Sequence, residues 1–275
     1  MRVVSYLAIS IVINMTARYR FIIVLVSTVL SAASYKFREG FEKGSSSWHV
    51  FEELVTTCYT ENVASVSTTD DISYRGQKSL VVWSNYGRST LSNHVIAGRN
   101  IFDGGVDGKI RYKLKALLPS ASFETTQVGP EFSYQNTRKF ANGTSYTAIG
   151  GIQYVASKYV SDKWKIWVET AANTAEWVTI PALSTMPALQ ADVWYTFKLK
   201  LDFTTCEYLS LQMMDTVTGA KHKVDLRGVR IAKEMRGFEP ASVITLEAEN
   251  LYSNCGTAGV FESVIYYDSV AVDKK

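Results

Sequence analysis

Strict alternation of apolar and polar residues recurs along this chain and limits the possible folds more than any other feature. It spans residues 110–115, 164–169, 195–203 and 243–249. A period of two places successive side chains on opposite faces of a β-strand, whereas an amphipathic helix repeats every 3.6 residues. No long stretch of the sequence shows the helical period. The pattern therefore predicts an all-β protein whose strands bury one face each.

Turn signals divide the chain into many short strands. Glycine follows Asp or Asn at 107–108 and 142–143, where a tight turn needs positive φ. Further strands are predicted at 36–42, 48–56, 62–68, 78–84, 127–135, 146–155, 175–180, 207–214, 222–226 and 260–272. Many short strands without intervening helices indicate an antiparallel sandwich or barrel. We expect one two-sheet domain over residues 34–275, in which strands 37–41 and 265–272 pair.

Residues 1–33 have the layout of an export leader. After Met15, which we take as the start, two arginines precede an apolar run at 21–30 and a group of small residues. This is the order of a secretory signal peptide, with cleavage near Ala33. A membrane anchor is the alternative, but 21–33 is shorter than the ~20 residues that a spanning helix needs. The sequence therefore predicts a secreted, extracellular protein with no integral membrane span in the mature chain.

The net charge of +3 belongs to the leader and not to the predicted domain. Residues 1–33 hold three of the 29 basic residues and no acid, so 26 basic residues remain beside the 26 acidic ones. A neutral domain lacks the concentrated basic face of a nucleic-acid-binding protein, and we expect no nucleic-acid partner. The apolar fraction of 47% excludes intrinsic disorder.

The cysteines Cys58, Cys206 and Cys255 permit one disulfide and one free thiol. We favour a bond between Cys206, which follows a strand-like run, and Cys255, which lies in a turn. Three reduced, buried thiols are the alternative. The absence of Cys-x-x-Cys spacing argues against a structural zinc site. The glycosylation sequon at 142–144 also reads as an Asn-Gly hairpin turn.

Short motifs, in order along the chain, resemble those of secreted jelly-roll carbohydrate-binding modules. Residues 37–48 resemble their Phe-Glu-x-Gly…Trp opening, 75–82 their Gly-x-x-Ser-Leu-x-Val strand, and 266–272 their closing Tyr-x-Asp-x-Val-x-Val strand. Residues 194–199 resemble a strand of laminin-G-like and concanavalin-A-like sandwiches. The resemblance implies a two-sheet antiparallel jelly-roll (concanavalin-A-like) sandwich that binds glycans. Polysaccharide lyases share this architecture.

Outward side chains of the predicted strands are suited to binding a polysaccharide on the concave outer face of one sheet. An aromatic ring stacks on a pyranose, and amides and charged groups bond to its hydroxyls. Trp167 shares its phase with two charged neighbours and is the first candidate for the sugar platform. The candidate carbohydrate-binding residues are Trp167, Lys165, Glu169, Arg111, Lys113, Gln135 and Gln153. An ordinary solvated sheet face would show the same pattern.

Carboxylates supply the candidates for catalysis. Glycoside hydrolysis needs two carboxyl groups about 5–10 Å apart. Glu247 and Glu249 stand two positions apart on one strand face, roughly 6–7 Å from each other, and Glu131 is a further candidate on a neighbouring strand. The Glu-x-Asp-x-x-Glu pattern of concanavalin-A-like glucanases is absent, and outward acids are also typical of a solvated surface. A lyase would need a His or Tyr base, for which no motif stands out.

The resemblance also implies a structural calcium ion that ties the first and last strands together. Glu39 or Glu42 with Asp268 would be the matching ligands, and hard oxygen ligands suit Ca²⁺. Acids that simply lie at the sheet edge are the alternative. The sequence as a whole predicts a secreted polysaccharide-binding sandwich. The alternatives are a polysaccharide lyase or glycoside hydrolase that acts on the same face, and an adhesion or surface-structural sandwich protein.

Overall fold

A computed structural model describes residues 36–55, 64–85, 92–120, 128–139, 144–156, 160–171, 174–234, 239–251 and 262–274. The predicted leader, Cys58, Cys255 and the turn at 140–143 lie outside the described residues. The described residues all belong to one compact unit, Ser34–Lys275. In these ranges no helix has the length and apolar character needed to cross a membrane.

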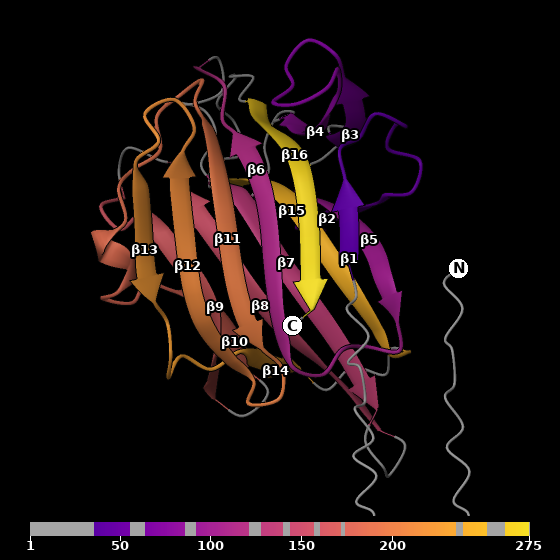
Figure 1. Cartoon of the computed structure of the whole chain (residues 1–275), viewed down its shortest axis with the longest axis vertical. Helices are drawn as coiled ribbons and strands as arrows, with labels where there is room; N and C mark the ends of the chain where they lie inside the picture. The colour runs from indigo at the N-terminus through magenta and orange to yellow at the C-terminus, as the bar shows by residue number, and fades with distance from the viewer. Residues whose placement is uncertain are drawn as a thin grey trace, which may run out of the picture. The chain divides into compact units, whose positions relative to one another are not determined.

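The strands form two eight-stranded antiparallel sheets, which pack face to face as a jelly-roll sandwich (Figure 1). Sheet A has the order β13-β12-β11-β6-β16-β4-β3, with β1 also paired to β16. Its strands are β1 (Lys36–Glu39), β3 (Ala64–Thr69), β4 (Ser79–Asn85), β6 (Lys109–Leu117), β11 (Trp194–Asp202), β12 (Glu207–Asp215), β13 (Lys221–Asp225) and β16 (Glu262–Lys274). Sheet B has the order β10-β9-β8-β7-β15-β5-β2, with β14 also paired to β8. Its strands are β2 (His49–Val55), β5 (Ser92–Asp103), β7 (Val128–Lys139), β8 (Ser145–Val155), β9 (Trp164–Ala171), β10 (Thr174–Val178), β14 (Ala232–Glu234) and β15 (Ala241–Leu251).

Alternate side chains from both sheets fill the space between them. The rings of Tyr112 and Phe197 in sheet A lie 5.9 and 5.4 Å from the ring of Phe132 in sheet B, measured between centroids. Trp164 is buried against Phe197. Each such side chain stabilises the fold by roughly 1.5–3 kcal/mol through removal from water. The intervening residues of each strand therefore point to one of two outer faces.

The two ends of the domain pair with each other, as predicted. In the antiparallel register of β1 and β16, Phe37 lies opposite Val272 and Glu39 opposite Val270. The apolar partners explain the pairing, because Phe37 and Val272 both contribute to the core. The ends of the described domain are thereby held in sheet A, where the last part of β16 lies between β1 and β6.

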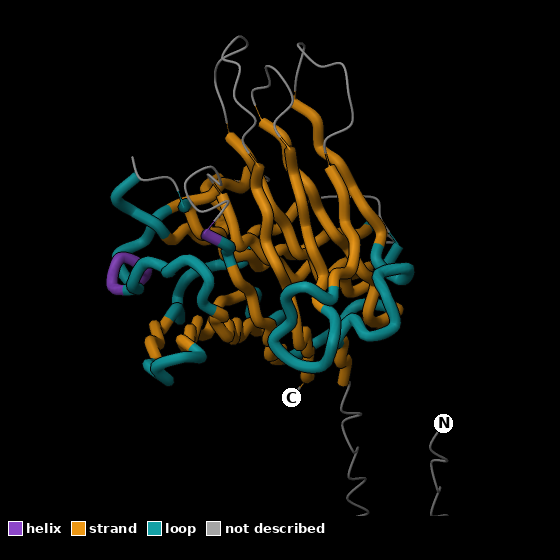
Figure 2. Tube along the Cα trace, turned by 90° about the horizontal axis from the view of Figure 1, so that it is seen from above, coloured by secondary structure: helices purple, strands orange, loops and turns teal. Residues whose placement is uncertain are grey.

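Most predicted strands are present within a few residues, and strands dominate the described chain (Figure 2). Two strands were not predicted. β5 contains the apolar run 95–97 followed by Gly98, which breaks the alternation, although the strand is held by β2 on one side and β15 on the other. β14 has three residues and exists through its pairing with β8. In both cases tertiary pairing, and not local pattern, creates the strand.

The predicted bond between Cys206 and Cys255 is wrong, because Cys206 is a free, buried thiol. Cys206 ends the turn before β12 with φ of 54°, and its Sγ lies 3.6 Å from the carbonyl oxygen of Phe203. The turn directs the thiol inward, where it behaves as a small apolar side chain.

Candidate functional site

The outer face of sheet B carries the densest group of polar side chains predicted to be functional. Core residues such as Phe132 and Leu246 alternate with outward polar ones along β7 and β15. Outward residues on neighbouring strands lie directly opposite each other in the order Glu247, Glu131, Gln153 and Lys165, across β15, β7, β8 and β9. We call these four residues the polar row. The sheet register therefore gathers residues that are far apart in sequence.

The two acids of the polar row are buried and hydrogen-bonded. Glu131 and Glu247 are only 3% and 5% exposed. The Gln153 amide donates to Glu131 Oε2 over 2.7 Å, and the Thr245 hydroxyl donates to Glu247 Oε1. The Thr245 hydroxyl also lies 2.7 Å from that of Ser133. These bonds orient both carboxylates on a face that would otherwise be expected to carry freely solvated side chains.

The hydroxyl of Tyr267 lies directly beneath the acid pair. Tyr267 belongs to β16 of sheet A, and its ring crosses the core to reach the backbone of sheet B. The hydroxyl lies 2.6 Å from the Glu247 carbonyl oxygen and 2.9 Å from that of Glu131, and the Glu131 N–H donates to it over 3.2 Å. The β7–β15 and β7–β8 registers both shift near this point, so backbone groups there need another partner. Burial, and then the charge of Glu247, raises the pKa of Tyr267, which keeps the hydroxyl protonated.

Two tryptophans lie beside the polar row. Trp167 on β9 and Trp177 on β10 are directly opposite in register, and their ring centroids are 5.2 Å apart. Both are partly buried, and the Trp167 indole N–H has no hydrogen-bond partner among the described residues. A side chain at Gly151 would meet Trp177 Cη2 at 2.9 Å and Ser133 Cβ at 3.2 Å. Glycine at this position therefore lets the Trp177 ring lie close to strand β8.

A second tyrosine of sheet A supports this Trp pair from below. The Tyr208 hydroxyl donates to the Trp167 carbonyl oxygen over 2.7 Å and accepts from the Gly151 N–H over 2.8 Å. Tyr208 is fully buried. Tyr208 and Tyr267 thus anchor the two halves of the candidate site to the core from the opposite sheet.

The structure brings together most of the predicted site residues but not all of them. Trp167, Lys165 and Glu169 lie on the outward face of β9, with Gln153 and Gln135 on neighbouring strands of the same sheet. Of the predicted acids, Glu131 and Glu247 are adjacent. Glu249 lies on β15 opposite Val128, and its side chain is outside the described part.

Arg111 and Lys113 do not belong to this site. They lie on β6 in sheet A, on the other side of the sandwich. The prediction that they share a face with Trp167 is wrong, because alternation assigns a residue to an outer face without saying which sheet carries it. Trp177 and Thr245 were not predicted. Only the register of the β9–β10 hairpin and of β15 brings them to the site.

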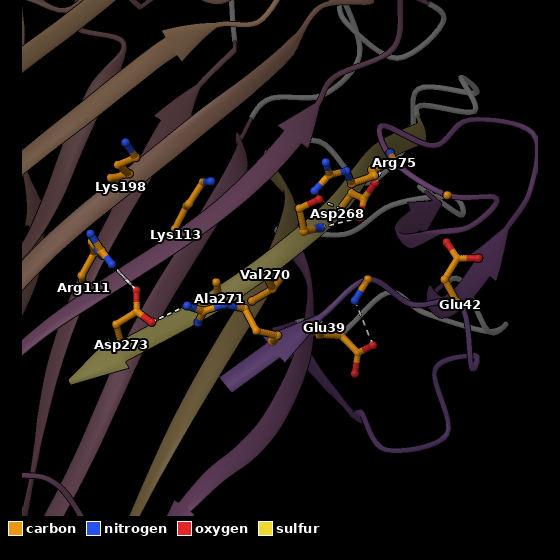
Figure 3. A pocket seen from close by; sticks show the side chains of 14 residues that line it. Glu39, Glu42, Arg75, Arg111, Lys113, Lys198, Asp268, Val270, Ala271 and Asp273 are labelled. Atoms are coloured by element: carbon orange, nitrogen blue, oxygen red, sulfur yellow. Dashed lines mark hydrogen bonds and ion pairs between the residues drawn. The ribbon is translucent and has the colours of Figure 1, made fainter. Parts of the chain in front are cut away.

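Arg111 and Lys113 instead line a cavity of about 610 Å³ on the outer face of sheet A (Figure 3). Near it, Lys115 is buried at 6% exposure. Its ammonium donates to Thr196 Oγ1 over 2.8 Å and lies 3.3 Å from the Tyr74 ring centroid. Loss of hydration lowers the pKa of Lys115 to about 8, although the charge of Asp268 opposes this shift.

The three candidate calcium ligands lie around the same cavity but engage different partners. Asp268 accepts from the backbone N–H groups of Tyr74 and Arg75 over 3.0 and 2.9 Å. Glu42 accepts from two backbone N–H groups of the same loop, at Gln77 and Lys78.

Glu39 accepts from the Phe41 N–H and forms an ion pair with Arg99. Within the described ranges, no three His, Cys, Asp or Glu side chains are grouped as metal ligands. The calcium ion therefore stays a prediction. Hydrogen bonds from the protein already engage the carboxylates that would hold it.

Comparisons with known proteins establish the fold. No family model and no curated protein matches the sequence. Among solved structures, an endo-β-1,4-glucuronan lyase from the fungus Trichoderma reesei matches with a TM-score of 0.52 and 13% identity, over 82% of this chain and 95% of that one. The cellulose-induced protein Cip1 matches with a TM-score of 0.44 and 12% identity, over 86% and 96% of the two chains. At this identity, the similarity to the lyase shows a shared jelly-roll sandwich fold.

Proposed function

We propose that this protein binds a polysaccharide on the outer face of sheet B. The observation that carries the proposal is the Trp pair, Trp167 and Trp177, next to the polar row. Both rings are partly exposed, whereas the neighbouring acids are buried. Partly exposed aromatic rings beside oriented polar groups form the combination that recognises a sugar.

Each part of this face has a distinct role in the proposal. The Trp rings stack on the apolar face of a pyranose, and Gln135, Lys165 and Glu169 bond to its hydroxyls from neighbouring positions. Glu131 and Glu247 hold neighbouring side chains of this face in place, since both carboxylates accept hydrogen bonds from the protein. Preorganised groups lose little conformational freedom when a ligand binds, which favours affinity.

Cleavage of the bound polysaccharide is a second candidate function. One specific observation favours it: Glu131 and Glu247 lie directly opposite each other, which puts their Cβ atoms about 4.5–5.5 Å apart. This spacing is compatible with the two carboxyl groups of a glycosidase. The fold shared with a glucuronan lyase adds weight to a carbohydrate substrate. The burial of both acids favours binding over cleavage as the first function.

The test measures binding and turnover on the same samples. Hexamers of β-1,4-linked glucose and glucuronic acid, with soluble plant, algal and animal polysaccharides, are titrated against the mature protein. Reducing ends and the ultraviolet absorbance of unsaturated products are followed in parallel. Binding without products supports the proposal. Products that form with the wild type and disappear in Glu131→Gln establish cleavage. The absence of binding to any of these oligosaccharides and polysaccharides overturns both functions.

Two variants locate the binding face. Trp167→Leu keeps an apolar side chain but removes the flat ring, so affinity should fall roughly tenfold. Trp194→Leu is the matched control, because Trp194 is also partly buried but lies on β11 of sheet A. Equal losses in the two variants would contradict the assignment to sheet B.

Export is proposed together with this function. The arrangement of Arg18, Arg20 and the apolar run 21–30 supports a signal peptide, and polysaccharides are found outside cells. Expression of the full chain in a secreting host, followed by N-terminal sequencing of protein from the medium, tests it. A mature protein that begins near Ser34 is expected, and retention of the whole chain inside the cell would contradict export.

A further inference from the structure

The cavity on the outer face of sheet A is independent of the site proposed above. It lies over β1, β6, β11 and β16, on the side of the sandwich opposite to the Trp pair. Arg111, Lys113 and Lys198 project from adjacent strands toward it (Figure 3).

Positive charges on this face oppose each other directly. Lys113 lies opposite Lys198, and Arg111 opposite Lys200, in the β6–β11 register. Like charges in directly opposite positions destabilise a sheet. Desolvation lowers the pKa of both Lys113 and Lys198, and neighbouring cations lower it further. A bound anion would reduce both the repulsion between the opposing cations and the cost of keeping these lysines charged.

The acids that line the cavity do not neutralise these lysines. Asp273 is held between Arg38 and Arg111, with its Oδ2 3.0 Å from Arg111 Nε. Glu39, Glu42 and Asp268 accept from the backbone or from Arg99, as described above. Among the described residues, neither Lys113 nor Lys198 has an ion-pair or hydrogen-bond partner.

The cations continue across the sheet beyond the cavity. The positions next to Lys113 and Lys198 on β12 and β13 are Gln212 and Lys223, and Lys221 lies on the same face of β13. Adjacent strands are about 4.8 Å apart, so these side chains form a row across the sheet and not a single point. A row suits an extended ligand with repeated negative charges better than it suits one small anion.

We propose that this row, with Lys113 and Lys198 at its centre, binds the carboxylate groups of an acidic polysaccharide such as a polyuronate. The Asp273 carboxylate illustrates how this face binds a carboxylate group, because Arg38 and Arg111 both form ion pairs with it. A nucleic acid is less well suited, because residues 34–275 carry 26 basic and 26 acidic residues and lack the concentrated positive charge that meets closely spaced phosphates. The ligand binds through its charges and needs no contribution from the Trp pair.

The test compares two hexamers that differ at the carboxylate. The β-1,4-glucuronic acid hexamer is titrated against Trp167→Leu, which removes the sheet B platform, and the β-1,4-glucose hexamer is the uncharged control. We expect the acid to bind to this variant more tightly than the weakened glucose hexamer, with an affinity that falls as salt rises from about 50 to about 500 mM. A 20-base-pair DNA duplex serves as a second polyanion.

Charge-matched variants made in the Trp167→Leu background then locate the contact. Lys113→Gln with Lys198→Gln should weaken binding of the acid roughly tenfold or more, with no loss of thermal stability, because it removes a like-charge pair. Lys139→Gln with Lys233→Gln removes the same charge from exposed positions in sheet B and should change nothing. Equal binding to the two double variants, equal binding of both hexamers, or tighter binding of the DNA overturns the proposal. The comparison of the two double variants and the DNA titration do not bear on the Trp pair, so the two sites can fail separately.

Discussion

Replacement of Tyr267 by Phe tests whether the acid pair of sheet B is anchored from the opposite sheet. The change removes one buried hydroxyl and keeps the ring, so no large cavity forms. It leaves the Glu131 N–H without its partner and takes a donor from the carbonyl oxygens of Glu131 and Glu247. A buried polar group left unsatisfied costs about 1–3 kcal/mol. We expect the free energy of unfolding to fall by about 2–3 kcal/mol.

Equilibrium unfolding in urea measures this loss. With an m-value near 2–3 kcal/mol/M, the midpoint should fall by about 1 M at unchanged slope. Tyr112→Phe is the matched control, because its hydroxyl makes one long bond, 3.3 Å to the Thr245 carbonyl oxygen, from the same sheet. That variant should lose about 0.5–1 kcal/mol. Equal losses in the two variants would refute the anchoring role of Tyr267.

Three further predictions concern other parts of the two faces. Gly151→Val should push Trp177 off β8, change the tryptophan fluorescence and weaken polysaccharide binding roughly tenfold; unchanged affinity would contradict the packing inferred from the contact at 2.9 Å. The pKa of Lys115 is lowered to about 8, so between pH 8 and its ordinary value of 10.5 the unfolded chain binds a proton that the folded chain lacks. The free energy of unfolding of the wild type should therefore rise with pH in that window relative to that of Lys115→Met. Parallel pH profiles of the two proteins would be inconsistent with the lowered pKa of Lys115. Asp268→Ala removes the carboxylate that accepts hydrogen bonds from the N–H groups of Tyr74 and Arg75, so trypsin should cut this loop after Arg75 faster than in the wild type. An unchanged rate of cleavage would show that other contacts hold the loop.

Local alternation predicts the architecture because it reports which residues face a core. Runs such as 195–203 have a period of two throughout, and the sandwich that they predict is the observed fold. The pairing of β1 with β16 is also predictable, since both end segments are strand-like and lack another obvious partner. β5 escapes prediction because Gly98 breaks its pattern and its neighbours supply the pairing.

The candidate site is less predictable, because it depends on register and on which sheet a strand joins. Trp167 and Lys113 have the same local pattern, yet they lie on opposite sides of the sandwich. Trp177 reaches Trp167 only through the β9–β10 hairpin. The role of Tyr267 is even harder to predict from the local pattern, because its ring crosses the core and its hydroxyl forms a hydrogen bond with the backbone of the other sheet. Such relations arise from tertiary contacts over long sequence separations.

A crystal structure with the tightest-binding uncharged oligosaccharide tests the assignment of the polysaccharide site most directly. We predict a sugar ring stacked on Trp167 or Trp177, with carbon atoms within about 4 Å of the indole and ring hydroxyls directed to the polar row. The uncharged glucose hexamer should occupy this face and no other. An uncharged sugar bound only on sheet A, with the Trp pair uncovered, would contradict polysaccharide binding on sheet B.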